Sequence, residues 1–149
     1  MQSRTGQVCA ALCFLAICVW RFEPAAELES ASDATMVDVV ALTTKYFEVW
    51  NAHDVSGIEA LHAAKSQLHD WDGTHGPTNA DVAKGIGGIW SSVPAIKIEI
   101  VDIYTCGTDT TCVANIKVVV DDKTTLKVCD VLEYDAAGKV VSLNAYLAK

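Results

Sequence analysis

Mainly apolar residues recur every three or four positions between residues 36 and 50, which is the spacing of one face of an α-helix. The series comprises Met36, Val39, Val40, Thr43, Phe47 and Trp50. Ser32 or Asp33 can cap the start of this helix, which we expect to end near "NAHD". Tyr46 lies at the edge of the apolar stripe.

Two further helices are expected before residue 94. Asp54 can cap a short helix over residues 55–63, and Thr78 or Asn79 can cap a third helix over residues 80–93. The third helix contains the glycine-rich stretch "GIGG", and each glycine weakens a helix by about 1 kcal/mol relative to alanine. We therefore expect this helix to be bent, short or closely packed.

From Pro94 onward the pattern changes to alternation with a period of two, which is typical of β-strands. Four strands are predicted, at residues 95–105, 111–120, 124–134 and 139–148. Short turn sequences separate them, so the four strands should form an antiparallel meander. Helices followed by strands indicate an α+β fold, in which helices cover the apolar face of a sheet.

The third predicted strand has one acidic residue on a face that is otherwise apolar or aromatic. Alternation places Asp130 on the same face as four apolar or aromatic residues, namely Leu126, Val128, Leu132 and Tyr134. An ionised carboxylate is costly to bury in such surroundings. Asp130 is therefore a candidate functional residue.

Composition and charge narrow the class of protein. The chain has 149 residues, of which 51% are hydrophobic, and a net charge of -8. One domain of this size can bury a core. The negative charge disfavours binding to nucleic acid or to anionic membrane surfaces.

The first part of the chain has the pattern of a targeting segment. Residues 8–20 form an apolar run that is shorter than a membrane span, so residues 1–22 are predicted to be a signal peptide or signal anchor. Residues 23–32 are a polar linker, and residues 33–149 form the domain. The expected location is the secretory pathway, secreted or lumenal, with membrane contact only through an uncleaved N-terminal segment.

Three cysteines remain in the predicted domain: Cys106, Cys112 and Cys129. Cys106 and Cys112 flank a turn and could form a disulfide across a hairpin. They could equally be two small hydrophobic strand residues, and both interpretations stay open.

Three stretches carry a family resemblance: "YFEVWNAHDVSGIEALHA", "SQLHDWDG" and "VCDVLEYDAAGKVVSLNAYL". Together they resemble the ketosteroid isomerase and SnoaL-like families of the nuclear-transport-factor-2-like (NTF2-like) superfamily, over about residues 36–147. The resemblance implies a cone-shaped, curved antiparallel sheet wrapped around about three helices. It also implies an apolar pocket inside the cone and a homodimer.

The resemblance further implies a set of catalytic residues. Ketosteroid isomerases use a tyrosine of the first helix, an aspartate after the second helix and an aspartic acid of the third strand, and Tyr46, Asp70 and Asp130 occupy matching positions. In this scheme Asp70 is the general base. Tyr46 and a protonated Asp130 donate hydrogen bonds to an enolate oxygen. Burial in an apolar pocket would raise the pKa of Asp130 and keep it protonated.

Each of these residues also has a structural interpretation. Tyr46 could be a boundary aromatic of its helix, and Asp130 could be a buried acid bonded to neighbouring groups. Asp72 competes with Asp70 for the role of base, in a stretch where turn-forming residues are common.

The chain departs from the isomerase pattern at two positions, where Trp71 replaces a proline and His62 replaces an apolar residue. His69 and His75 could be drawn with the neighbouring aspartates as a metal site, but a solvated polar loop is the more common arrangement. No metal or other cofactor is expected.

The expected function is that of a cofactor-independent acid–base enzyme, isomerase-like, which transfers a proton on a hydrophobic carbonyl compound. One alternative is a noncatalytic domain for small-molecule binding or dimerisation. Another is a SnoaL-like cyclase or dehydratase on the same scaffold. The expected partners are a hydrophobic small molecule and a second copy of the chain.

Overall fold

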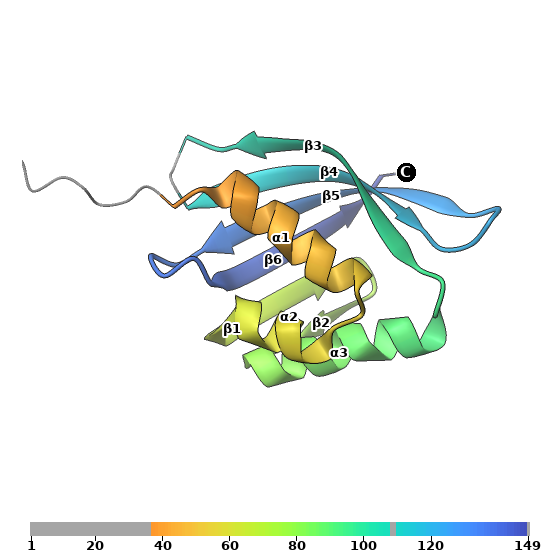
Figure 1. Ribbon diagram of the computed structural model, residues 1–149, viewed down its shortest axis with the longest axis horizontal. Helices are drawn as coiled ribbons and strands as arrows, with labels where there is room; N and C mark the ends of the chain where they lie inside the picture. The colour runs from red at the N-terminus through yellow and green to blue at the C-terminus, as the bar shows by residue number, and fades with distance from the viewer. Residues whose placement is uncertain (1–36, 108–109, 149) are drawn as a thin grey trace, which may run out of the picture. The chain divides into compact units, whose positions relative to one another are not determined.

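The computed structural model describes residues 37–107 and 110–148. It contains three helices and six strands, shown in Figure 1. The helices are α1 (Val39–Asn51), α2 (Val55–Leu61) and α3 (Asn79–Ser92). The strands are β1 (His62–Asp70), β2 (Gly73–His75), β3 (Lys97–Thr105), β4 (Thr111–Val119), β5 (Thr125–Tyr134) and β6 (Val140–Leu147).

The strands form one curved sheet in the order β2-β1-β6-β5-β4-β3. The meander predicted from the sequence is confirmed as β3 to β6, whose neighbours all pair antiparallel. The sheet as a whole is mixed, because β1 pairs parallel to β6. Together the helices and the sheet make the predicted α+β cone.

The sequence did not predict β1 and β2, and the end of the predicted second helix was wrong. Residues 62–63 open β1 instead of ending α2. Simple alternation fails in β1 because its pairing with β6 shifts register between His62 and Gln67, so its buried positions are unevenly spaced.

Side-chain caps start each helix. The side chain of Asp38 accepts a hydrogen bond from the backbone N–H of Ala41, and Asp54 does the same for Gly57. Thr78 and Asp81 form a reciprocal capping box at the start of α3. Asp54 and Thr78 were predicted caps and are confirmed, whereas Ser32 and Asp33 lie outside the described residues.

The glycines of α3 have different surroundings. A Cβ atom at Gly85 would overlap the ring of His75, whereas one at Gly88 would have no neighbour within 4 Å. Close packing of the helix, one of the predicted outcomes, is therefore confirmed at Gly85. The helix itself is 14 residues long, so it is not short.

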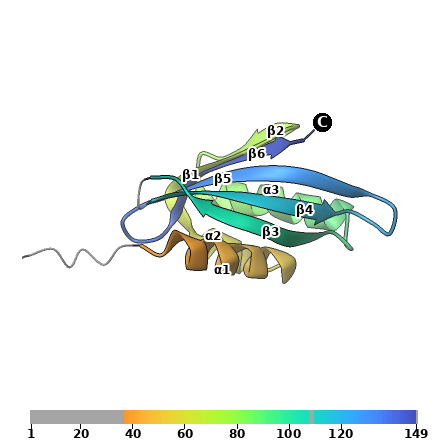
Figure 2. The same ribbon diagram turned by 90° about the horizontal axis from the view of Figure 1, so that it is seen from above.

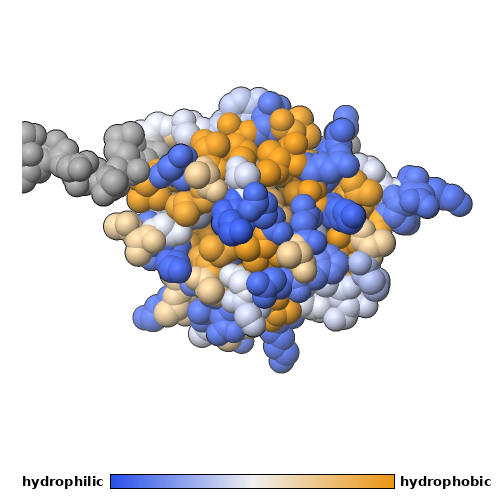
Figure 3. Space-filling view, viewed as in Figure 1, coloured by the Kyte–Doolittle hydropathy of each residue, from blue (hydrophilic) through white to orange (hydrophobic). Residues whose placement is uncertain are grey.

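The helices cover one face of the sheet, and Figures 1 and 2 show α1 lying across that face. Inward residues of α1 and α3 meet alternating residues of β3 to β6 in one hydrophobic core. On the outer side of α1, Lys45 and Glu48 form an exposed ion pair, and Figure 3 shows hydrophilic residues among hydrophobic ones on this face.

Several large hydrophobic side chains are exposed on β3 and β6, including Ile100, Val101, Tyr104 and Tyr146. The homodimer expected from the sequence stays a prediction. Within the described residues, no helix has the length and apolar character needed to cross a membrane. The predicted signal segment and linker lie outside the described residues.

Candidate functional site

A cavity of about 230 Å³ lies between the helices and the sheet. Most of its wall is aliphatic or aromatic, with carboxyl groups at three positions. The lining residues are Tyr46, Phe47, Trp50, Leu68, Asp70, Trp71, Asp72, Ile86, Ile89, Val93, Ile96, Ile98, Ile116, Val118, Val120, Leu126, Val128, Asp130, Leu143 and Ala145. Tyr46, Asp70 and Asp130, which the sequence singled out, therefore share one cavity.

Asp130 reaches the cavity from the inward face of β5. Val128, Leu132 and Tyr134 on the same face are buried, as the alternation predicted. Asp130 itself is 5% exposed, and its Oδ1 atom has no hydrogen-bond partner among the described residues. Burial, and secondarily the charge of Asp70, raise the pKa of Asp130 to about 7. A carboxyl group of this kind can be protonated, and so donate a hydrogen bond, near neutral pH.

Tyr46 enters the cavity from the inward face of α1 and is 2% exposed. Its hydroxyl lies 3.4 Å from Nε2 of His62. Burial is the main cause that raises the pKa of Tyr46 above its ordinary value, followed by the charges of Asp130 and Tyr134. The hydroxyl therefore keeps its proton throughout the neutral range and is a potential donor.

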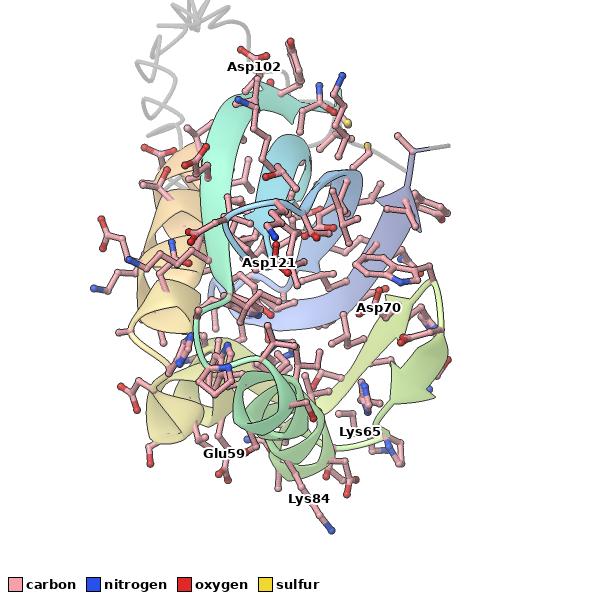
Figure 4. All side chains as sticks on the ribbon, turned by 90° about the vertical axis from the view of Figure 1, so that its right-hand side faces the viewer. Glu59, Lys65, Asp70, Lys84, Asp102 and Asp121 are labelled. Atoms are coloured by element: carbon pink, nitrogen blue, oxygen red, sulfur yellow. The ribbon has the colours of Figure 1, made fainter. Side chains whose placement is uncertain are left out.

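Asp70 is the last residue of β1, and Figure 4 looks onto the end of the domain where this strand ends. It is half-buried, and its Oδ1 atom accepts a hydrogen bond of 2.8 Å from the backbone N–H of Trp71. Burial raises the pKa of Asp70, and the Trp71 hydrogen bond opposes that rise. The charge of Asp72 raises this pKa further and that of His75 lowers it.

Asp72, the competing candidate base, also lines the cavity but is exposed. Asp70 is the more deeply placed of the two carboxylates. A less hydrated carboxylate is the better proton acceptor, because water stabilises its charge less.

A disulfide between Cys106 and Cys112, one of the two interpretations that the sequence left open, is not formed. Cys112 pairs with Thr105 and is fully buried, whereas Cys106 is exposed. Cys106 follows the end of β3 and is not the cross-strand partner of Cys112. Cys106, Cys112 and Cys129 are all free.

His69 points away from the cavity. Its ring nitrogens lie 3.1 Å from Oγ1 of Thr74 and 3.2 Å from Oε1 of Gln67. In the part of the chain that the structure describes, no group of three or more His, Cys, Asp or Glu side chains is arranged to hold a metal ion.

A second buried polar cluster lies beside the cavity. Oγ1 of Thr43 is 2.7 Å from the hydroxyl of Tyr134 and 2.8 Å from Sγ of Cys112. These three groups satisfy one another, and none of them lines the cavity. The ionisable groups that line the cavity are therefore those of Tyr46, Asp70, Asp72 and Asp130.

His62 is an unusual polar residue in the sequence, but its contact with Tyr46 was not predicted. His62 is 3% exposed and packs edge-on against the Tyr46 ring, with the ring centres 5.7 Å apart. Burial lowers the pKa of His62 to about 4, so its imidazole is neutral at neutral pH. A buried polar residue was the available signal, but the partner depends on how α1 packs near the start of β1.

A sequence profile of the SnoaL-like domain matches residues 43–143. Among solved structures, a SnoaL-like protein of unknown function from Burkholderia thailandensis has a TM-score of 0.65 and 13% identity, covering 77% of this chain and 97% of its own. An NTF2-like protein of unknown function from Cytophaga hutchinsonii has a TM-score of 0.62 and 9% identity, with coverages of 75% and 91%.

A third similar structure is that of the epoxide hydrolase/cyclase-like enzyme SalBIII, which has a role in pyran ring formation in the polyether salinomycin. Its TM-score is 0.62 at 13% identity, with coverages of 74% and 90%. No curated protein sequence matches the chain significantly. At these identities the structures establish the fold, and the chemistry has to come from the cavity.

Proposed function

We propose that this chain, which belongs to the SnoaL-like family of the NTF2-like superfamily, is a cofactor-independent acid–base enzyme acting on a hydrophobic carbonyl compound. The observation that carries the proposal is the placement of Asp130. It is a buried acid whose Oδ1 atom has no hydrogen-bond partner among the described residues, and it shares an apolar cavity with Tyr46 and Asp70.

The proposed reaction moves a proton between two carbons of an unsaturated ketone. Ionised Asp70 removes a proton from the carbon next to the carbonyl group, and the electron pair moves onto the carbonyl oxygen to give a dienolate. Tyr46 and protonated Asp130 donate hydrogen bonds to that oxygen. Asp70 then returns the proton to the distal carbon, the double bond shifts into conjugation, and the enzyme is restored.

The charges of the cavity wall favour an uncharged ligand. Its carboxyl groups belong to Asp70, Asp72 and Asp130, and none of the described lining residues is Lys, Arg or His. A ligand carboxylate would meet like charges in a poorly hydrated site, where repulsion is strong. A neutral ketone avoids this repulsion and can accept hydrogen bonds from Tyr46 and Asp130.

A cyclase acting by epoxide opening is a second candidate. Its support is the fold shared with SalBIII, together with two carboxyl groups of different depth in one cavity. In this case protonated Asp130 would donate a proton to the epoxide oxygen while Asp70 removed one from an attacking hydroxyl group of the same substrate. The ring would form as the epoxide carbon–oxygen bond broke.

The first test measures isomerisation of a β,γ-unsaturated cyclic ketone by the purified protein, followed by the ultraviolet absorbance of the conjugated product. We expect turnover in the wild type and a loss of about 100-fold or more in Asp70→Asn, because proton transfer by a placed base contributes at least that much. Asp72→Asn should keep most of the activity.

The oxyanion donors need matched controls. Tyr46→Phe and Asp130→Leu should each lower turnover, because each removes a donor to the developing negative charge. Tyr104→Phe and Asp102→Asn change exposed residues of β3 and should have no effect. Turnover that survives all of the cavity substitutions would contradict the proposal. An epoxy alcohol substrate, assayed with the same variants, tests the cyclase alternative.

A further inference from the structure

The hydroxyl of Tyr46 has one hydrogen-bonding neighbour among the described residues, and that neighbour is His62. The separation of 3.4 Å between the hydroxyl and Nε2 is at the long end for a hydrogen bond. The two rings also meet edge-on, and both residues are buried. His62 does not line the cavity, so it does not contact a ligand there directly, whereas Tyr46 does line it.

A neutral imidazole carries one N–H group and one bare nitrogen. His62 is neutral at neutral pH because burial lowers its pKa, which leaves two tautomers. With the proton on Nδ1, Nε2 would accept the hydroxyl proton of Tyr46 and turn it away from the cavity. With the proton on Nε2, the imidazole donates to the tyrosine oxygen, and the hydroxyl proton is free to point to the cavity.

The surroundings of Nδ1 favour the second arrangement. This atom is buried and has no hydrogen-bond partner among the described residues. A bare nitrogen without a donor is less costly to bury than an N–H group without an acceptor, as the rarity of orphaned N–H groups in proteins indicates. In the tautomer protonated on Nε2, the unpaired Nδ1 atom is a bare nitrogen, which is the less costly group to bury.

We propose that His62 is a positioning residue for Tyr46: its Nε2–H group donates to the tyrosine oxygen and so directs the tyrosine proton toward the ligand oxygen. Accepting a hydrogen bond also polarises a hydroxyl group and makes it a better donor. The inference rests on the proposed function only in that Tyr46 is taken to contact the ligand.

The tautomer is measured directly by ¹⁵N NMR of the histidine side chains in the purified wild-type protein, assigned by comparison with His62→Gln. We expect the His62 signals of a neutral imidazole protonated on Nε2. Protonation on Nδ1 would overturn the proposal. This measurement needs no ligand, so it tests His62 even if the proposed function fails.

The effect on binding is measured with 2-acetonaphthone, an aryl ketone whose oxygen accepts hydrogen bonds and donates none. Trp50 and Trp71 line the cavity, so tryptophan fluorescence can report binding. His62→Phe should weaken binding about three-fold to ten-fold, the worth of one hydrogen bond. His62→Gln, whose side-chain amide can still donate, should recover most of the affinity.

A double-mutant cycle separates positioning from folding. In a Tyr46→Phe background, His62→Phe should have no further effect on ketone binding. An equal loss in both backgrounds would show that His62 acts on the ligand or on the fold, and would overturn the proposal. Substitution of His69 by Phe, on the other side of β1, is the control and should leave affinity unchanged.

The outcomes for the two proposals are distinguishable. Ketone binding and turnover in the wild type, with both unaffected by His62→Phe, would overturn the role of His62 and leave the proposed function standing. Absence of binding and turnover, with the Nε2 tautomer observed, would overturn the proposed function and support the orientation of the Tyr46 proton by His62.

Discussion

Asp130 and Asp70 line the same cavity, and the charge of Asp70 is second only to burial among the causes that raise the pKa of Asp130 to about 7. The two carboxyl groups differ in depth, since Asp130 is buried and Asp70 is half-buried. Two titratable groups whose environments separate their pKa values can act as acid and base in one reaction. The proposed chemistry depends on this difference.

Removing the charge of Asp70 should change the titration of Asp130. In Asp70→Asn the electrostatic contribution is lost and only burial still raises the pKa, so the pKa of Asp130 should fall below about 7. A ¹³C NMR titration of the aspartate carboxyl carbons measures it. Asp102→Asn serves as the control and should leave the Asp130 titration unchanged.

Ketone binding should depend on pH through Asp130. The carboxyl group can donate to a ketone oxygen only while protonated, so affinity for 2-acetonaphthone should be highest below pH 7 and fall as the pH rises above about 7. An amide donates at every pH, so Asp130→Asn should flatten the profile. Fluorescence titrations between about pH 5 and about pH 9 make the comparison. Equal pH dependence in both proteins would argue against Asp130 as the donor.

Asp130 should also make folding stability depend on pH. Its pKa rises from 3.8 in the unfolded chain to about 7 in the fold, so its stabilising contribution is fully present below about pH 4 and is lost as the pH rises through about 7. The difference between the two pKa values corresponds to a change of about 4 kcal/mol at most in the free energy of unfolding, at about 1.4 kcal/mol per pKa unit.

Urea unfolding of wild type and Asp130→Asn measures this contribution. The free energy of unfolding of the wild type should decline relative to that of the variant between about pH 4 and about pH 7. Contributions from groups that do not interact with Asp130 cancel in the difference between the two proteins. A constant difference over this range would mean that Asp130 does not titrate as described.

His62 should make folding stability depend on pH in the opposite direction from Asp130. Its pKa is lowered from 6.5 to about 4 by burial, so its contribution is present above about pH 6.5 and is lost as the pH falls through about 4. The loss corresponds to about 3 kcal/mol. Acid unfolding of wild type and His62→Gln, followed by circular dichroism, should show that the variant loses less stability between about pH 6.5 and about pH 4.

The glycines of α3 offer a test with an internal control. Gly88→Ala should stabilise the protein by about 1 kcal/mol, because alanine favours a helix and the added Cβ atom has no neighbour within 4 Å. Gly85→Ala should instead destabilise it, because the added atom would displace the His75 ring. Thermal unfolding of both variants measures the difference. Stabilisation by both substitutions would contradict the close packing at Gly85.

Hydrophobic periodicity alone determined much of the fold. The spacing of apolar residues located α1, and alternation located β3 to β6 and placed Asp130 on an inward face. These predictions succeed because a helix or a strand exposes and buries its residues with a fixed local period. Tyr46, Asp70 and Asp130 were named from the sequence by resemblance, and their catalytic roles stay predictions.

Only the tertiary structure decided which distant segments meet. The register shift in β1 hides its alternation, and its parallel pairing with β6 joins strands more than 70 residues apart. The contact between His62 and Tyr46 and the separation of Cys106 from Cys112 likewise follow from packing and strand register. Local patterns specify which face of an element is buried, whereas the identity of each buried neighbour depends on how complete elements pack together.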